Sequence, residues 1–445
     1  MNRRGADNLM GCAILALAAI VLGLLTRNML AIPAHVPLDP NEGWNAAHAM
    51  ALTAGRGLYP PQGAFMVNNY PPLSFYIVAA LARLTGDFIV AGRILSLLAF
   101  LIVCAGIAIL ARCMDATRQA AMIGALFFAA ALLATSDYVG MNDPQLLGHA
   151  VQIAALLLVL AHAPIAAAAL FAASLFIKHN LLALPLACAI WLLWQDRRAG
   201  LGFIAAGLLF AGAGLIGFRL VHGTGLLSQI SSPRLASFAN VRAGMLHLWW
   251  AALPLVAMIS LRRDRWGWLC LIYGAIALVL GAAFSAGDGV DANAFFDLTI
   301  ALSLALALTA EARPILAASA AAPLVIFLAL NFSDNNFFFT RAFADQSAHD
   351  IAFLKSHPGP ALCDQLSLCL WAKKDAEVDV FNTGEAIESG ARDPASLAEL
   401  ITSRHFTVIQ IQDPDALGPQ VHQAIAHNYR LDHSDDNGNF LTPDS

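Results

Sequence analysis

Carboxylate and amide side chains gather in a short polar segment near the N-terminus, at residues 38–48. Asp39 and Glu42 stand three residues apart there, and a carboxylate can act as a general base that takes the proton of a reacting hydroxyl. A structural interpretation is also open. Asp39 as N-cap, Pro40 at the first helical position and Glu42 at the third would form a capping box for a helix through Met50. The two interpretations are compatible, since one carboxylate can cap while the other faces a cleft.

Other polar residues stand at the ends of apolar runs, where they are candidates for substrate binding. Asn69 and Tyr70 follow the first polar segment, and Asp143 precedes a proline at the start of an apolar run, a pattern typical of a helix N-cap. Lys178 and His179 interrupt an apolar hairpin. A lysine at this position could extend to the membrane surface, or it could bind a phosphate whose lipid tail lies in the bilayer.

Two later polar segments add charge of both signs. Arg234 and Arg242 lie within residues 222–245, and several basic residues together favour an anionic partner such as the phosphate of a lipid carrier. Asp291 and Asn293 lie in the last polar loop and could accept sugar hydroxyls. A divalent cation could bind there, but the loop lacks the spacing and final Glu of an EF-hand, and no Cys or His set has zinc spacing. We therefore predict neither a metal site nor a cofactor.

The composition identifies the elements that must hold these residues. The chain has 445 residues, 59% of them hydrophobic and only 12% charged, with a mean hydropathy of +0.66. A soluble protein carries about twice that charged fraction, which excludes a soluble enzyme, a disordered regulator and a free nucleic-acid binder. Residues 1–331 carry a net charge of +5 and residues 332–445 one of −10. We therefore predict a polytopic membrane protein whose C-terminal tail lies in water.

Apolar runs of about 20 residues are the length that crosses a bilayer as a helix. The segment at 71–84 begins with two prolines and ends near Arg83, so we predict a helix that lies in the interface, within a first outer loop at 33–87. About eleven other runs predict transmembrane helices, near 10–31, 88–111, 118–135, 145–161, 164–177, 181–194, 199–221, 246–260, 266–285, 295–309 and 313–331.

An odd number of spans places the two termini on opposite sides of the membrane. The arginine pairs at 3–4, 197–198 and 262–263 then share the side of the N-terminus, which the positive-inside rule makes cytoplasmic. The tail is therefore outside, where Cys363 and Cys369 could pair if the compartment is oxidising. We predict a small α/β domain there, with helix-like or strand-like pieces at 347–356, 361–362, 378–381, 394–403, 406–411 and 421–428.

The order of these segments resembles the GT-C superfamily of integral-membrane glycosyltransferases, and in particular bacterial proteins of glycosyltransferase family 39. That family includes aminoarabinose–lipid A transferases and protein O-mannosyltransferases. The resemblance covers about the first 330 residues and rests on four segments, at 39–45, 70–76, 142–144 and 178–180. It implies an inverting transfer of a sugar from a polyprenyl-phosphate donor to a hydroxyl, at a site between the first outer loop and the outer ends of the spans.

The resemblance also implies roles for individual residues. The family places an Asp-Glu pair in the first outer loop, which here aligns with Asn41 and Glu42, so alignment indicates Glu42 as the base and leaves Asp39 as the alternative. Lys178 matches a family lysine near the donor phosphate. Arg234 and Arg242 fall where the donor loop of the family lies.

Together these observations predict a multi-pass protein of the bacterial inner membrane, with a catalytic transmembrane domain at 1–331 and a soluble extracytoplasmic α/β domain at 332–445. Its partners would be the bilayer, a polyprenyl-phosphate hexose or pentose donor, and a lipid, polymer or protein acceptor, with no nucleic acid. One alternative is a transporter or flippase of a lipid-linked saccharide, which would show polar residues at the midplane and repeat symmetry. Another is a non-catalytic membrane scaffold, in which Asp39 and Glu42 could be replaced without loss of activity.

Overall fold

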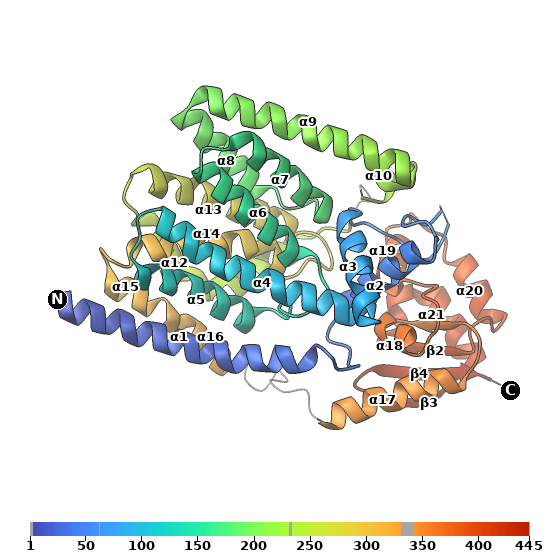
Figure 1. The fold of residues 1–445 in the computed structure, drawn as a ribbon. Coiled ribbons are helices and arrows are strands. Elements are labelled where there is room, and N and C mark those ends of the chain that lie inside the picture. Colours follow the sequence, from blue (N-terminus) through green and yellow to red (C-terminus); the bar gives the residue numbers. More distant parts are fainter. Residues whose placement is uncertain (1–2, 62, 231–233, 331–340, 445) are drawn as a thin grey trace.

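A bundle of long helices makes up most of the molecule, and a small sheet with its own helices lies at one end of it (Figure 1). The computed structural model describes residues 3–61, 63–230, 234–330 and 341–444, so the predicted boundary at 331/332 falls outside the described residues. The N-terminus and the C-terminus lie at opposite ends of the molecule (Figure 1). The predicted class, a helical membrane protein with a C-terminal sheet region, is confirmed.

The apolar runs of the sequence are helical wherever they are described. Some of these helices are shorter than a bilayer crossing requires: a helix of 14 residues such as Pro164–Ile177 is only about 21 Å long, against a hydrocarbon core of about 30 Å. The shorter apolar helices are α6 (Gln145–Leu160), α7 (Pro164–Ile177), α8 (Ala183–Gln195), α15 (Pro314–Ser319) and α16 (Ala321–Leu330). Seven described helical segments are long and apolar enough to cross a bilayer, namely Asn8–Ala31 in α1 (Arg3–Ala31), α4 (Phe88–Cys113), α5 (Arg118–Thr135), α9 (Arg197–His222), Phe238–Ile259 (α11, Phe238–His247; η1, Leu248–Ala251; α12, Ala252–Ile259), α13 (Arg265–Phe284), and Ala292–Thr309 (η2, Ala292–Phe295; α14, Phe296–Thr309).

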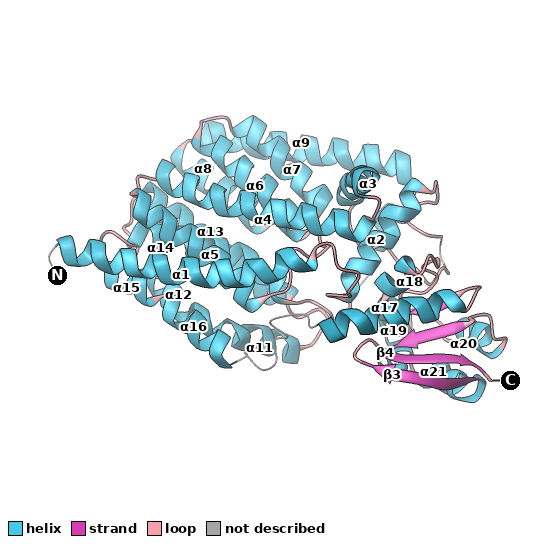
Figure 2. Ribbon diagram, turned by 60° about the horizontal axis from the view of Figure 1, so that its bottom comes forward, coloured by secondary structure: helices cyan, strands magenta, loops and turns pink. Residues whose placement is uncertain are grey.

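Two short helices cross the end of the bundle that carries the sheet. Pro40–Thr53 (α2) is the helix predicted from the capping pattern, and Asp39 is its N-cap. Leu73–Thr85 (α3) ends at Gly86, whose φ of 75° stops the helix in the left-handed region. Figure 2 shows α3 nearly end-on while α4 and α9 run across the page, an orientation that supports the interfacial position predicted for this segment.

The C-terminal region is built on a four-stranded sheet in the order β1-β2-β4-β3. β1 and β2 pair in parallel, and β4 pairs antiparallel with both β2 and β3. The predicted piece at 378–381 is the start of a helix, and β3 and β4 were not predicted. The elements are α17 (Arg341–Ser356), β1 (Ala361–Cys363), α18 (Leu366–Trp371), α19 (Val380–Glu388), α20 (Ala395–Thr402), β2 (Val408–Ile411), η3 (Pro414–Leu417), α21 (Pro419–Asn428), β3 (Tyr429–Asp435) and β4 (Gly438–Pro443).

This region sits directly on the first loop, with α18 against α2 (Figure 1). The backbones approach so closely that a Cβ on Gly43 would lie 2.2 Å from the amide nitrogen of Ser367, which only glycine permits. Trp371 adds a hydrogen bond from its indole nitrogen to Asp87, which precedes α4, at 3.0 Å. Cys363 and Cys369, which the sequence allowed to pair, form a disulfide that joins β1 to α18.

Candidate functional site

Asp39 stands at the start of α2, at the end of the bundle nearest the sheet. Its Oδ1 accepts a hydrogen bond of 2.8 Å from the backbone of Asn41, which is the predicted N-cap contact. Burial raises the pKa of Asp39 to about 6, and the negative charges of Glu42, Asp143 and Asp291 add to the rise, against the hydrogen bond from Asn41. A half-buried carboxyl with this pKa is suited to accept a proton near neutral pH.

Glu42, one turn further along α2, is completely buried in an ion pair with Arg93 of α4. The guanidinium contacts both carboxylate oxygens, Nε to Oε1 and Nη2 to Oε2, each at 2.7 Å. The backbone nitrogens of Asn142 and Leu38 also donate to Glu42, at 3.1 and 3.2 Å. Both oxygens are therefore occupied, and the geometry favours Asp39 over Glu42 as a proton acceptor.

Arg93 was not among the residues selected from the sequence, although a charged residue within an apolar span is a recognisable signal. Besides Glu42, its guanidinium donates to the backbone carbonyl oxygens of Ala31, Ala34 and Val36 at 2.7 to 2.8 Å. These carbonyls belong to the end of α1 and the segment that leads into α2. Arg93 therefore fixes the loop that carries Asp39 against α4.

Asp143 and Lys178 form a second buried ion pair beside the first. The ammonium of Lys178 lies 3.1 Å from both carboxylate oxygens of Asp143, and it donates to the hydroxyl of Tyr70 at 3.2 Å. Burial alone would lower the pKa of Lys178, but Asp143 and Tyr70 raise it above its usual value. Asp143 also accepts a hydrogen bond from the backbone of Gln145, the first residue of α6, but the N-cap of this helix is Pro144, so the N-cap predicted at Asp143 is one residue too early. Three predicted residues, from the first loop, the α6 start and the end of α7, thus meet here.

Arg234 approaches from the segment before α11. Its guanidinium donates to the carbonyl of Asp288 at 2.8 Å, lies 4.0 Å from the carboxylate of Glu385, and stands over the ring of Phe381 at 5.5 Å. Because Glu385 and Phe381 belong to α19, the C-terminal region helps to hold this arginine. Arg242 is exposed on α11 and has no hydrogen bond or ion pair within the described residues.

The other predicted residues occupy different environments. Asn69 donates to Asn382 of α19 at 3.3 Å, and His179 is exposed at the turn after Lys178. Asn293 is buried and bonded to Gln145, so it faces α6 and is not open to solvent. Asp291 is exposed and caps η2. It lines a hollow of about 340 Å³ whose further walls include Asn240, His247, Ser285, Asp288 and Phe295.

Asp379, just before α19, is a buried carboxyl that sequence reasoning missed. Its Oδ2 accepts hydrogen bonds from the indole of Trp44 at 2.9 Å and from the Asn382 side chain at 2.6 Å. Burial raises the pKa of Asp379 to about 6, although the hydrogen bonds from Asn382 and Trp44 oppose the rise. Trp44 also packs edge-on against Tyr70, with ring centres 4.9 Å apart. The C-terminal region therefore contributes a buried carboxyl that holds Trp44 against Tyr70.

These residues can carry out acid–base and anion-binding chemistry. A carboxyl with raised pKa, two cations and several amide groups lie at one end of an apolar bundle, where a polar headgroup and its lipid tail could bind together. Within the part of the chain that the structure describes, the one group with a metal-ligand arrangement lies elsewhere, on α17 and β3.

Comparison with known proteins supports the fold. Residues 67–221 match a family described as "6-pyruvoyl-tetrahydropterin synthase related domain; membrane protein". This match includes Tyr70, Asp143 and Lys178 but covers only 155 of the 445 residues. No curated protein sequence is similar to the chain.

Two solved structures are similar over nearly the whole chain. The crystal structure of ArnT from Cupriavidus metallidurans bound to undecaprenyl phosphate has a TM-score of 0.60 at 14% identity, and covers 99% of this chain and 98% of that one. The apo structure of the same protein has a TM-score of 0.59 at 14% identity, with 96% of each chain covered. At this identity the similarity concerns the fold alone, and the chain has an ArnT-like fold over nearly its whole length, as the resemblance in the sequence predicts.

Proposed function

We propose that this chain is an inverting membrane glycosyltransferase, which moves a hexose or pentose from a polyprenyl-phosphate donor to a hydroxyl of an extracytoplasmic acceptor. The observation that carries the proposal is the fold, which matches over 99% of the chain a structure that holds undecaprenyl phosphate. The residues around Asp39 support it, because they provide a proton acceptor and cations at the same end of the bundle.

In this mechanism Asp39 is the general base. Its carboxylate takes the proton of the acceptor hydroxyl while the hydroxyl oxygen attacks the anomeric carbon from the face opposite the phosphate. The bond from that carbon to the phosphate oxygen breaks with its electron pair on the phosphate, so the configuration inverts and polyprenyl phosphate leaves. The raised pKa of Asp39 supports this role, since a base is most effective when its pKa lies near the working pH.

Lys178 and Arg234 are the cations that we assign to the donor phosphate. The Asp143 carboxylate neutralises Lys178, whose ammonium donates to both oxygens of Asp143 and to Tyr70, so a donor phosphate would take over one of these three hydrogen bonds. Negative charge grows on the phosphate as the bond breaks, so preplaced cations stabilise the transition state more than the ground state. The further substrate-binding residues that we propose are Asn69, Tyr70, Asp143, His179, Asp291 and Arg242; Asn293 was predicted with them, but its burial against α6 removes it from this set.

We place the protein in the bacterial inner membrane, with the N-terminus in the cytoplasm and the C-terminal region, beyond residue 331, outside. The disulfide between Cys363 and Cys369 supports an oxidising compartment for that region. The location of the two termini at opposite ends of the molecule supports an odd number of spans (Figure 1). The donor would then reach the site within the outer leaflet, with its lipid chain against the bundle.

The test is transfer of radiolabel from polyprenyl-phosphate hexose or pentose donors to a membrane extract by purified protein in detergent. Asp39→Asn keeps an N-cap residue but removes the base, so we expect transfer to fall by about 10²- to 10⁴-fold with an unchanged fold. Asp137→Asn is the matched control, because the Asp137 side chain is 62% exposed and pairs only with Arg27 among the described residues. We expect the control to retain full activity.

Two outcomes would contradict the proposal. If wild-type protein binds these donors but transfers no label from any of them, the chain is not a transferase for this class of donor. Asp39→Asn protein with full transfer would leave the enzyme class intact and remove Asp39 from the role of base.

A further inference from the structure

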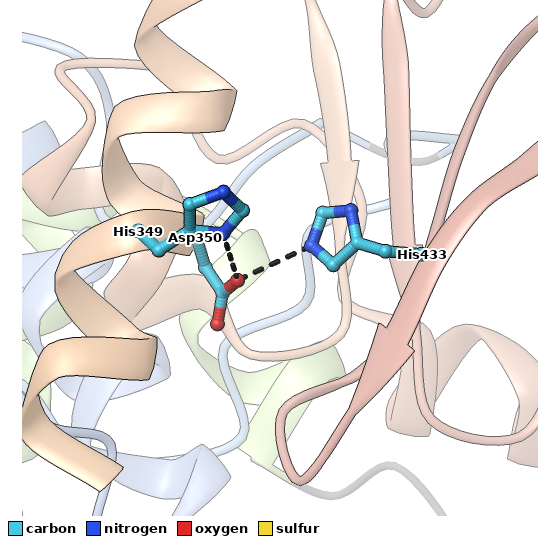
Figure 3. A group of neighbouring side chains, drawn as sticks. All are labelled: His349, Asp350 and His433. Atoms are coloured by element: carbon cyan, nitrogen blue, oxygen red, sulfur yellow. Dashed lines mark hydrogen bonds and ion pairs between the residues drawn. The ribbon is translucent and has the colours of Figure 1, made fainter. Parts of the chain in front are cut away.

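A buried carboxylate faces two imidazoles at the edge of the C-terminal sheet (Figure 3). Asp350 of α17 is completely buried. Its Oδ1 lies 3.2 Å from Nε2 of His433 on β3 and 3.6 Å from Nδ1 of the neighbouring His349. No lysine or arginine pairs with Asp350 within the described residues, and the carboxyl of Asp435 also lies beside it, so the two imidazoles are the nearest groups that can carry positive charge.

An irregularity in strand β3 places His433 at this position. β3 contains a bulge between Leu431 and His433, where the pairing with β4 passes from Leu441 directly to Phe440. Without the extra residue His433 would face the α20–α21 side of the sheet, as Tyr429 does. The bulge turns His433 toward α17, where its ring stacks on Phe440 with centres 4.5 Å apart.

Neighbouring groups orient the side chains that meet here. Asp432 lies 3.0 Å from Nδ1 of His433 and can accept a hydrogen bond from it, which would leave Nε2 available to a cation held beside Asp350. Asn437 donates to Oδ2 of Asp350 at 2.6 Å and leaves Oδ1 for another partner. Such contacts to the far atoms of ligands are typical of metal sites.

We propose that His349, Asp350 and His433 bind a divalent transition-metal ion of the zinc type. The three ligand atoms lie within 4.8 Å of one another. Bonds of about 2.0–2.1 Å in a tetrahedron place neighbouring ligand atoms about 3.3 Å apart, close to the 3.2 and 3.6 Å seen around Oδ1. Two nitrogens and a carboxylate oxygen are a usual zinc ligand set, and Asp435, 4.0 Å from His433, can supply the fourth oxygen.

The ion would join α17 to the edge strand of the sheet. α17 is the first described helix after the last apolar helix of the bundle, so a bound ion would fix the entry into the C-terminal region. Sequence inspection missed this set because its histidines come from one helix and one strand, 84 positions apart. The alternative is that protonated imidazoles alone balance Asp350, and this is an outcome of the test.

The experiment uses the full chain in detergent, with an affinity tag that contains no histidine, after removal of metals by a chelator. Titration with Co²⁺ should give the visible absorption of a tetrahedral site at one ion per chain, and Zn²⁺ should displace it and raise the melting temperature. His349→Ala should weaken binding at least tenfold and still fold, because the His349 side chain is 69% exposed. His422→Ala is the matched control, since His422 also contacts a carboxylate, Asp415, at 2.6 Å.

Equal binding by wild type, His349→Ala and His422→Ala would overturn the proposal, since the metal would then sit elsewhere. Absence of Co²⁺ and Zn²⁺ binding by wild type would overturn it in favour of the imidazolium alternative. Both measurements are independent of sugar transfer, so their failure would leave the proposed function untouched.

Discussion

The Glu42→Gln variant separates a structural role of this residue from a catalytic one. The buried pair with Arg93 predicts that this substitution acts on stability first, because it leaves the guanidinium charge buried without its counter-ion. Removing one partner of a buried ion pair costs about 3–5 kcal/mol. We expect the low end of that range, about 3 kcal/mol, because Arg93 keeps three backbone carbonyls as acceptors.

This loss can be converted into a melting temperature. An unfolding entropy of about 2.1 cal/mol/K per residue gives about 0.9 kcal/mol/K for 445 residues, so 3 kcal/mol lowers the melting temperature by about 3 °C. The assay is a thermal melt in detergent, followed by the transfer rate per folded molecule. Asp137→Asn should shift the melt by less than about 1 °C, because its pair with Arg27 is exposed.

A double-mutant cycle sharpens the test. Arg93→Leu leaves a buried carboxylate without its cation, whereas Glu42→Leu with Arg93→Leu leaves no charge at all, so the double variant should be more stable than Arg93→Leu alone. A Glu42→Gln protein that melts like wild type and has lost transfer would contradict a structural role for Glu42. That result would make Glu42 the base, as the family alignment indicates, and the pair with Arg93 incidental.

Three further predictions concern proton binding, the disulfide and the contact of the C-terminal region with α2. Because the pKa of Asp39 is raised to about 6, transfer should rise about tenfold per pH unit below 6 and level off above it in a pH–rate profile. Because the pKa of Asp39 is higher in the folded state, protonation of Asp39 stabilises the fold, and wild type should lose up to about 3 kcal/mol of unfolding free energy relative to Asp39→Asn between pH 4 and pH 8. A difference in melting temperature between the two proteins that is the same at both pH values would contradict this expectation. Replacing Cys363 and Cys369 by alanine opens a seven-residue loop and should cost about 2 kcal/mol in denaturant unfolding, with an unchanged midpoint as the contrary result. Trp44→Phe removes the indole donor to buried Asp379 and should lower the melting temperature by about 1–2 °C, whereas an equal melt would show that this hydrogen bond adds nothing.

Local patterns predicted the parts of the fold that depend on neighbours in sequence. The apolar runs became helices because a backbone in lipid must satisfy its own polar groups, and this requires no knowledge of the partners of a helix. Asp39 and Pro40 likewise predicted the start of α2 without knowledge of distant partners, because a helix cap involves only residues of the first turn. The sequence also indicated that Asp143 and Lys178 belong to the same end of the bundle.

Features that depend on distant partners could not be predicted in this way. The role of Glu42 follows from Arg93, 51 positions away, and the burial of Asp379 follows from Trp44, 335 positions away. One miss did have a local signal. Asp436 and Asn437 join β3 to β4, and an Asn followed by a Gly, here Gly438 at the start of β4, is typical of a hairpin between alternating residues.

The contacts of the C-terminal region change what a truncation could reveal. Glu385 holds Arg234, and Asp379 binds Trp44 beside Tyr70, so this region supports the cations that we assign to the donor phosphate. Deleting it would expose Gly43 and the face of α2 behind Asp39, and would lower transfer whether or not the region recognises the acceptor. Acceptor recognition is therefore better tested by substitutions on exposed residues of α20 or α21, which leave the contacts of α18 and α19 with the first loop in place.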